Sequence, residues 1–339
     1  MTKSAQLRHK DVVAINYQEL IAEYSDDLEK TESAIRDNFV SDVALIPQIS
    51  SYLTEGGGKR IRPLLLIVSA RLTGYTGAKR YIPLSVVMEY IHAATLLHDD
   101  VVDDADIRRG EQSANIKFGN QASVLVGDFL FAKSLELMSQ DSDIRVIQTI
   151  STATKNLAEG EVMQLVNTGD LEITEQKYLH TIYRKTGALI EACCITGAIL
   201  GDATKEKEDA LRIYGKNIGF AFQLIDDALD YTGDTEKWGK PLGADLAEGK
   251  VTMPLIRALK MADTAERKAI ERMIESDELQ KEDFEIALAI LKKYETISYT
   301  IDLARGYVEE AKQQLSAFEQ SSHLDTLYTL ADYIVERNV

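Results

Sequence analysis

The segment from residue 81 to residue 99 is almost wholly apolar and carries one charged residue, Glu89, before its acidic end. A helix of this kind must be buried on most sides, so other helices have to surround it. Long helices are also predicted at 120–140, 142–167, 174–200 and 205–231. Few segments alternate strictly between apolar and polar residues, so we expect an all-α fold without a sheet. After residue 264 the helices look shorter and more polar, hence more superficial.

No linker rich in glycine, proline or serine divides the 339 residues. We therefore expect one helical domain over 1–339, with an N-terminal helical extension over about residues 1–40. The net charge of -17 argues against nucleic acid as a partner, because binding phosphates requires basic surface. The sequence contains neither a signal peptide nor an apolar run long enough to span a membrane, so we expect a cytoplasmic protein.

Two of the predicted helices end in the same acidic pattern, at 96–103 and 223–230. Carboxylates four residues apart share one helix face, where like charges destabilise a helix by about 0.2–0.5 kcal/mol. Mg²⁺ compensates such charge, since it binds one or two carboxylates together with water and substrate phosphates. One copy would be a solvated helix end, whereas two copies predict facing helices that hold Mg²⁺ around a diphosphate. The aspartates are Asp99, Asp100, Asp103, Asp226, Asp227 and Asp230.

The loop at 55–63 carries three glycines and three cations before a predicted helix. Backbone N–H groups at a helix start and the fork of an arginine both suit phosphate oxygens. No Ser or Thr follows Lys59, so the loop is not a Walker motif. An ordinary basic turn stays open as the alternative.

Further basic residues have two interpretations each. Arg108 and Arg109 follow the first acidic motif and could form salt bridges with it or clamp two diphosphates. Lysines at 185, 240 and 250 stand in uncharged or glycine-flanked settings and could be surface residues. His92 lies seven residues before Asp99, on the same side of the helix, and lines the same cavity unless it is a plain core residue.

In order and spacing, these motifs resemble the trans-polyprenyl diphosphate synthase family over residues 56–250. The resemblance implies an orthogonal bundle of long helices around a deep central cavity, usually in a homodimer. It implies a prenyltransferase that condenses isopentenyl diphosphate onto an allylic diphosphate, with up to three Mg²⁺ ions. The matching strings are Gly57-Gly-Lys-Arg-Ile-Arg-Pro, Leu97-His-Asp-Asp-Val-Val-Asp, Arg108-Arg109-Gly110, Gly127-Asp128, Gly160-Glu-Val-Met-Gln, Lys185-Thr186, Phe222-Gln-Leu-Ile-Asp-Asp-Ala-Leu-Asp and Gly239-Lys240-Pro-x-Gly-x-Asp245.

The resemblance also implies a role for each matching residue. All six aspartates belong to the metal site, with Asp99, Asp103 and Asp226 as direct ligands. Isopentenyl diphosphate is expected to contact Lys59, Arg62, His92 and Arg109. The allylic diphosphate is expected to contact Arg108, Lys185, Thr186, Gln223, Lys240 and Lys250. The residues expected to act in catalysis are Asp99, Asp103, Arg108, Lys185, Thr186, Gln223, Asp226 and Lys240.

The length of the product depends, by the same resemblance, on the residues beneath Asp99. Bulky aromatic residues four or five positions before that aspartate stop growth early in the family, and here Thr95 and Ala94 are small. Met88 lies further down, and Phe131 is the candidate floor. We therefore expect an octaprenyl to decaprenyl product for quinone side chains, made from farnesyl diphosphate and released with transient membrane association.

Other functions remain open at this point. A short-chain synthase would use the same motifs, but the small residues at 94 and 95 argue against it. A class I terpene cyclase would lack a second Asp-Asp-x-x-Asp motif and an isopentenyl site. A non-catalytic subunit of a heteromeric synthase would lose aspartates or basic residues that this chain keeps. A purely structural bundle would need neither motif.

Overall fold

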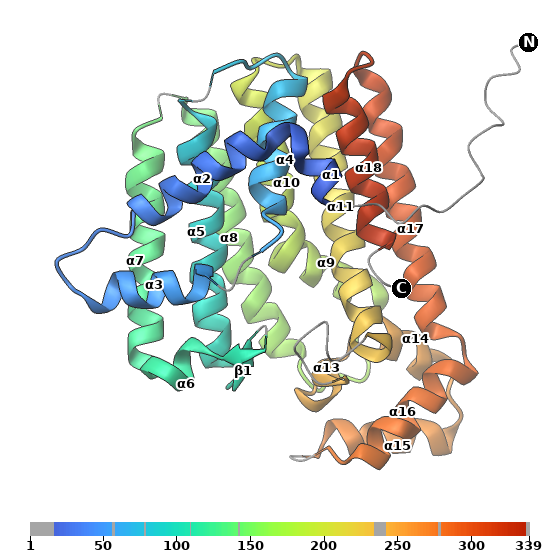
Figure 1. Cartoon of the computed structure of the whole chain (residues 1–339). Helices are drawn as coiled ribbons and strands as arrows, with labels where there is room; N and C mark the ends of the chain where they lie inside the picture. Colours follow the sequence, from blue (N-terminus) through green and yellow to red (C-terminus); the bar gives the residue numbers. More distant parts are fainter. Residues whose placement is uncertain are drawn as a thin grey trace, which may run out of the picture.

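The computed structural model describes residues 17–55, 58–77, 79–108, 110–141, 143–233, 242–276 and 279–336. Within these ranges the chain is almost entirely helical, which confirms the all-α prediction (Figure 1). The long helices expected at 81–99, 120–140, 142–167 and 205–231 are all present. The upright helices of the bundle are α4 (Ile61–Leu72), α5 (Tyr81–Val102), α7 (Asn120–Ser139), α8 (Ile144–Asn167), α10 (Ala188–Leu200), α11 (Lys205–Thr232) and α17 (Thr296–Gln314).

The centre of the bundle is built from its most apolar helices. Helix α5 packs against α4 and α7, and α10 packs against α4, α8 and α11. Nearly every residue of α10 is buried, as the run from Ala188 to Leu200 requires. In the described part of the chain, no helix combines the length and the apolar character needed to cross a membrane.

Side-chain caps fix where several helices begin. Asp143 accepts a hydrogen bond from the Arg145 amide at 3.0 Å before α8, and Thr204 accepts one from the Lys207 amide before α11. Each bond satisfies a backbone N–H group that has no partner within the helix. Because α11 starts at Lys205 and runs unbroken to Thr232, its last turns bring the second acidic motif to the lower end of the bundle (Figure 1).

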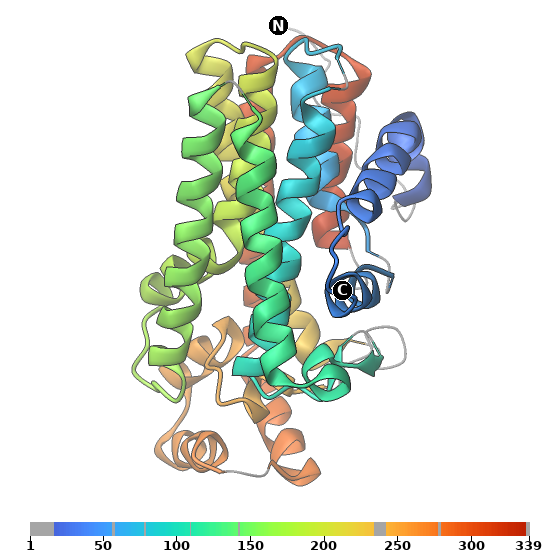
Figure 2. The ribbon, with the colours of Figure 1, turned by 90° about the vertical axis from the view of Figure 1, so that its left-hand side faces the viewer.

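The N-terminal helices cross the outside of the bundle. They are α1 (Tyr17–Ile21), η1 (Ala22–Tyr24), α2 (Ser25–Asp37) and α3 (Leu45–Glu55). Figure 2 shows α2 and α3 lying outside the upright helices, and α2 contacts both α4 and α5. Residues 17–37 of the expected extension are thus helical and packed against the bundle.

The C-terminal helices, including those after residue 264, are only partly superficial. Short helices α13 (Ala244–Ala247), α14 (Met253–Met261), α15 (Thr264–Ile274) and α16 (Lys281–Lys293) gather at the lower end in Figure 1. Helix α17 instead packs along α11, and α18 (Ser322–Glu336) packs on α4 and α11, after the turn η3 (Leu315–Ala317). The expectation was wrong for α17 and α18, because one buried stripe suffices to dock a largely polar helix.

Two local features were not predicted. A two-stranded antiparallel hairpin, β1 (Ile107–Arg108) with β2 (Glu111–Gln112), follows α5 and leads into α6 (Ala114–Phe118), so the expected absence of any sheet was wrong here. The helix expected over 174–200 is divided into α9 (Glu175–Ile182), one π-helical turn η2 (Tyr183–Gly187) and α10. Both features lie beside residues of the predicted site.

Helices α4 and α10 approach closely because Gly197 has no side chain. A Cβ atom built on Gly197 would lie 2.5 Å from the Cβ of Ser69 and 2.6 Å from the carbonyl oxygen of Leu66. Both distances are too short for a methyl group, and the obstacle is largely helix backbone, which cannot rotate away.

Replacing Gly197 with Ala should therefore destabilise the protein by about 1–3 kcal/mol through overpacking. Gly306→Ala is the matched control, since a Cβ there meets nothing within 4 Å, and it should stabilise α17 by about 0.5–1 kcal/mol. Urea unfolding at a fixed protein concentration measures both changes. Equal stability of the two variants would contradict this account of the α4–α10 contact.

Candidate active site

A cavity of about 240 Å³ lies between the two acidic motifs. Its walls come from α5, α8, α9, η2, α11 and the segment from 245 to 252. Of the predicted site residues, those that line it are Asp99, Asp103, Arg108, Lys185, Gln223, Asp227 and Lys250. Residues more than 150 positions apart in sequence thus meet in one place. The volume is below the roughly 300 Å³ of a small ligand pocket, so it suits a diphosphate with cations better than a long hydrocarbon chain.

The first acidic motif holds two basic partners. Arg108 donates from Nε to Oδ1 of Asp100 at 2.6 Å, and Asp100 is fully buried. Its other oxygen, Oδ2, is buried without a hydrogen-bond partner. Lys250 donates to Oδ2 of Asp103 at 3.0 Å and so ties the segment after α13 to the end of α5. The loss of either cation would leave a shielded carboxylate uncompensated.

Asp99 lies one helical turn from Asp103 and is half-buried. Burial raises the pKa of Asp99 to about 7, and the charges of Glu161 and Asp103 add to the rise, while Lys185 opposes it. The ionised form of this carboxyl therefore lacks sufficient positive charge in its surroundings.

The second acidic motif is fixed by a chain of hydrogen bonds. Thr186 donates to Oε1 of Gln223 at 2.8 Å, and Gln223 donates from Nε2 to Oδ1 of Asp227 at 3.1 Å. The hydroxyl of Tyr178 donates to Oδ2 of Asp227. Burial raises the pKa of Asp227 to about 8, and the charge of Asp245 adds to the rise. The amide of Gln223 is thereby oriented with its oxygen toward η2.

Asp226 and Asp230 lie beside this chain. Both are half-buried, and neither lines the cavity. The Asp245 amide donates to Oδ2 of Asp230 at 3.2 Å, which holds the start of α13 against α11. Asp226 adds negative charge near both Asp227 and Arg62. Asp227, although fully buried, lines the cavity, whereas Asp226 was expected from the sequence to be the direct ligand.

Lys185 and Thr186 lie within the π-helical turn η2. The Ala188 amide donates to the carbonyl of Tyr183, five residues earlier, which is the bond of a π-helix. A Cβ on Gly160 of α8 would lie 2.4 Å from the backbone nitrogen of Lys185, and one on Gly219 of α11 would lie 2.5 Å from Cα of Gly187. Glycine on both neighbouring helices therefore lets them approach the widened turn that presents these two side chains.

The residues expected to bind isopentenyl diphosphate form a separate group. Arg62 lies in the first turn of α4, with its Nε atom buried and without a hydrogen-bond partner. His92 is half-buried on α5. The ammonium of Lys59 lies 5.0 Å from the ring centre of Tyr333 in α18, and Lys59 does not line the cavity. Arg109 and Lys240 lie outside the described residues.

The four residues expected to set product length do not line the cavity. Met88 and Ala94 are fully buried in α5. Thr95 is half-buried and donates to the carbonyl of His92 at 2.8 Å. Phe131 of α7 lies with its ring centre 5.7 Å from that of His98. Their effect on product length stays a prediction.

Several residues that the structure places at the site were given no role in the sequence analysis. Glu161 accepts a hydrogen bond from Lys185 at 2.8 Å, and Gln164 lines the cavity one turn later. The sequence signal that could have identified both residues is their three-residue spacing, which places the two side chains on one face of a helix. Tyr178 had no such signal, because a single tyrosine in an amphipathic helix normally belongs to the core. Asp245 belonged to a matching string but had received no role.

The donor set fits divalent cations. In the ranges that the structure describes, no three His, Cys, Asp or Glu side chains are already gathered around a metal position. Mg²⁺ takes one or two carboxylates and completes its shell with water and phosphate oxygens. The unpartnered Oδ2 of Asp100 and the raised pKa values of Asp99 and Asp227 show where positive charge is needed.

Mg²⁺ with inorganic pyrophosphate should therefore stabilise the protein. At about one hundred times its dissociation constant, a ligand adds about 2.7 kcal/mol to the free energy of unfolding, and EDTA should remove the gain. Asp99→Asn should abolish the gain while raising the thermal midpoint of the metal-free protein, because it removes a poorly compensated charge. Differential scanning calorimetry measures both effects.

Asp302→Asn in α17 serves as the control, because the side chain of Asp302 is exposed and does not line the cavity. This variant should keep the full gain. A gain that survives in Asp99→Asn would show that the cation binds elsewhere.

Comparison with known proteins assigns the family. Residues 43–291 match the model of the family described as polyprenyl synthetase. The octaprenyl diphosphate synthase of Haemophilus influenzae is 39% identical over 98% of this chain and 100% of its own length. A polyprenyl synthase from Caulobacter crescentus, solved with calcium and isoprenyl diphosphate, superposes with a TM-score of 0.92 at 39% identity, over 96% of this chain and 99% of that one.

A decaprenyl diphosphate synthase from Rhodobacter capsulatus superposes with a TM-score of 0.90 at 41% identity, over 95% of this chain and 99% of that one. The resemblance drawn from the motifs is thereby confirmed over nearly the whole chain. The chain belongs to the polyprenyl synthetase family, whose members share this all-α fold.

Proposed function

We propose that this protein is a long-chain trans-polyprenyl diphosphate synthase that adds isopentenyl diphosphate head to tail to an allylic diphosphate. The observation that carries the proposal is the single cavity in which carboxylates of both acidic motifs meet Arg108, Lys185 and Lys250. Farnesyl diphosphate is the proposed primer, and the proposed products are octaprenyl to decaprenyl diphosphates for quinone side chains.

The cavity residues suit the departure of a diphosphate. Arg108, Lys185 and Lys250 line the cavity and are proposed, together with Lys240, to supply positive charge to the allylic diphosphate. Up to three Mg²⁺ ions bound by the aspartates would supply the remaining charge that a leaving diphosphate requires. Breaking the carbon–oxygen bond leaves an allylic cation, and the double bond of isopentenyl diphosphate attacks it. A proton then passes to an oxygen of the released diphosphate.

Neutral oxygens close to η2 suit the cation. The hydroxyl of Thr186, the side-chain oxygen of Gln223 and the carbonyl of Lys185 are dipoles that stabilise positive charge without reacting with it. The bonds from Thr186 to Gln223 and from Gln223 to Asp227 fix their orientation before the reaction. Exclusion of water from the cavity protects the cation from hydrolysis.

Isopentenyl diphosphate is proposed to bind Lys59, Arg62, His92 and Arg109. The buried Nε of Arg62 supports this assignment, because a buried donor without a partner is costly unless an anion completes it. The exposed ammonium of Lys59 would have to turn from Tyr333 toward the ligand.

Two other functions fit less well. A short-chain synthase would stop at farnesyl or geranylgeranyl diphosphate, which the small residues Ala94 and Thr95 do not favour. A non-catalytic subunit needs no complete site, yet here the first acidic motif has two basic partners within hydrogen-bond distance, and hydrogen bonds from Tyr178 and Gln223 hold Asp227 of the second.

A homodimer is proposed from an exposed apolar face. Leu125 of α7 is 67% exposed and Val166 of α8 is 74% exposed, and these helices run side by side (Figure 2). The remaining apolar residues of this face are Val124 and Leu135 of α7 and Ile144, Val162 and Leu165 of α8. A second copy of the same face would bury them. Cytoplasmic location and transient membrane association for product release stay predictions.

The proposed activity is tested with purified protein, Mg²⁺, labelled isopentenyl diphosphate and farnesyl diphosphate, with product length read by chromatography after dephosphorylation. A ladder that ends between C40 and C50 is expected, and EDTA or Asp99→Ala should abolish it. Products that stop at C15 or C20 would refute the long-chain assignment. Folded protein that incorporates no isopentenyl units would refute the synthase assignment.

Thr95→Phe tests the proposed path of the growing chain. Thr95 lies one turn before Asp99 on the same face of α5, so an aromatic ring there should obstruct the product and shorten it by several isoprene units. Ile286→Phe, on the exposed side of α16, should leave the ladder unchanged. An active Thr95→Phe enzyme that still makes the wild-type product would show that the chain grows along another path.

A further inference from the structure

Arg60 has an unusual backbone conformation in the middle of the basic loop. It stands between Lys59 and Arg62 and caps the start of α4, with φ 44° and ψ 40° in the left-handed region. Residues other than glycine, asparagine and aspartate rarely adopt this conformation, which costs roughly 1–2 kcal/mol. Other contacts must therefore hold Arg60 in place.

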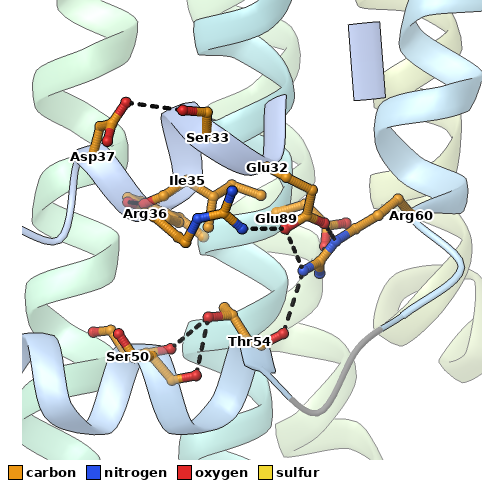
Figure 3. Close-up of polar contacts among 11 residues, drawn as sticks. Glu32, Ser33, Ile35, Arg36, Asp37, Ser50, Thr54, Arg60 and Glu89 are labelled. Atoms are coloured by element: carbon orange, nitrogen blue, oxygen red, sulfur yellow. Dashed lines mark hydrogen bonds and ion pairs between the residues drawn. The ribbon is translucent and has the colours of Figure 1, made fainter. Parts of the chain in front are cut away.

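Two carboxylates from different helices hold the Arg60 side chain (Figure 3). Nη1 donates to Oε2 of Glu89 at 2.7 Å, while Nε and Nη2 donate to the two oxygens of Glu32, the latter at 3.2 Å. The side chain of Arg60 is 13% exposed and that of Glu89 is 8% exposed. Charge-assisted, bidentate bonds in such shielded surroundings are among the stronger polar contacts in proteins.

Glu32 belongs to α2, in the N-terminal extension. The same extension reaches the preceding residue of the loop, because the hydroxyl of Tyr17 in α1 donates to the carbonyl oxygen of Lys59. Glu89 belongs to α5, three residues before His92. Two successive residues of the basic loop are thus held from outside the bundle by the extension, and one of them is also held from within by α5.

We propose that the N-terminal extension sets the conformation of residues 59–62, the part of the basic loop proposed to bind isopentenyl diphosphate, with Glu32 and Arg60 as positioning residues. This inference rests on the proposed binding of that substrate by Lys59 and Arg62. When the Glu32–Arg60 contact is lost, the strained backbone of Arg60 relaxes and the loop spends less time in its binding conformation. The apparent affinity falls in proportion to that fraction, whereas the occupied loop is ordered by the diphosphate itself.

The predicted signature is a separation of KM from kcat. Glu32→Ala should raise KM for isopentenyl diphosphate by about tenfold, with kcat within about twofold of wild type and KM for farnesyl diphosphate unchanged. Glu32→Gln keeps one acceptor oxygen for Arg60 and should give an intermediate KM. Steady-state kinetics on the full chain measure these values, at a temperature where circular dichroism shows each variant to be folded.

Asp27→Ala is the matched control on the same helix. Asp27 is buried in α2, forms an ion pair with Arg71 and accepts a hydrogen bond from Tyr81 at 2.6 Å, so it attaches α2 to the bundle without touching the loop. It should lower the thermal midpoint and leave KM for isopentenyl diphosphate unchanged. An equal rise in KM for Asp27→Ala and Glu32→Ala would overturn the inference, because any loosening of α2 would then suffice.

Arg62→Ala distinguishes a failure of the positioning role from a failure of the substrate assignment. It should raise KM for isopentenyl diphosphate more than Glu32→Ala does, since it removes a proposed direct contact. If Arg62→Ala raises KM and Glu32→Ala does not, the positioning role is refuted and the substrate assignment stands. If Arg62→Ala leaves KM unchanged, the loop does not bind isopentenyl diphosphate and the inference falls with that assignment.

Discussion

The rest of the site depends on one constraint: carboxylates of α5 and α11 line the same cavity. Burial raises the pKa of Asp99 to about 7 and that of Asp227 to about 8, so the ionised forms require positive charge from their surroundings. For Asp99 the chain supplies part of this charge through Lys185 and Arg108. In the proposed function the remainder comes from divalent cations, so that this incomplete compensation suits the cavity to a metal diphosphate.

Rigid helices hold these charges at the required positions. Glycines on α8 and α11 admit the π-helical turn that presents Lys185 to the cavity and Thr186 to Gln223. The hydrogen bonds from Tyr178 and Gln223 fix Asp227 from α9 and from its own helix. The residues proposed to bind the metal and the leaving group and to stabilise the cation therefore stand on elements whose mutual positions are determined by helix packing, as preorganised catalysis requires.

Patterns within single helices could be predicted from the sequence, and contacts between helices could not. The apolar run before Asp99 and the repeated acidic ends predicted α5, α11 and the polarity of the cavity. Nothing local marked Tyr178 as a partner of Asp227, or Glu32 as a partner of Arg60, because such pairs are defined only by packing. The π-helical turn was missed for the same reason: helical periodicity tolerates one inserted residue, and the glycines that admit it lie on other helices.

The central claim is that both acidic motifs act on one metal diphosphate. Crystals of the full chain grown with Mn²⁺ and inorganic pyrophosphate would test it most directly, since anomalous scattering locates Mn²⁺ independently of the protein atoms. The account predicts Mn²⁺ peaks at carboxylates of both α5 and α11, with one pyrophosphate between them and beside Lys185. Mn²⁺ at only one motif, or a pyrophosphate bound outside the cavity, would contradict it.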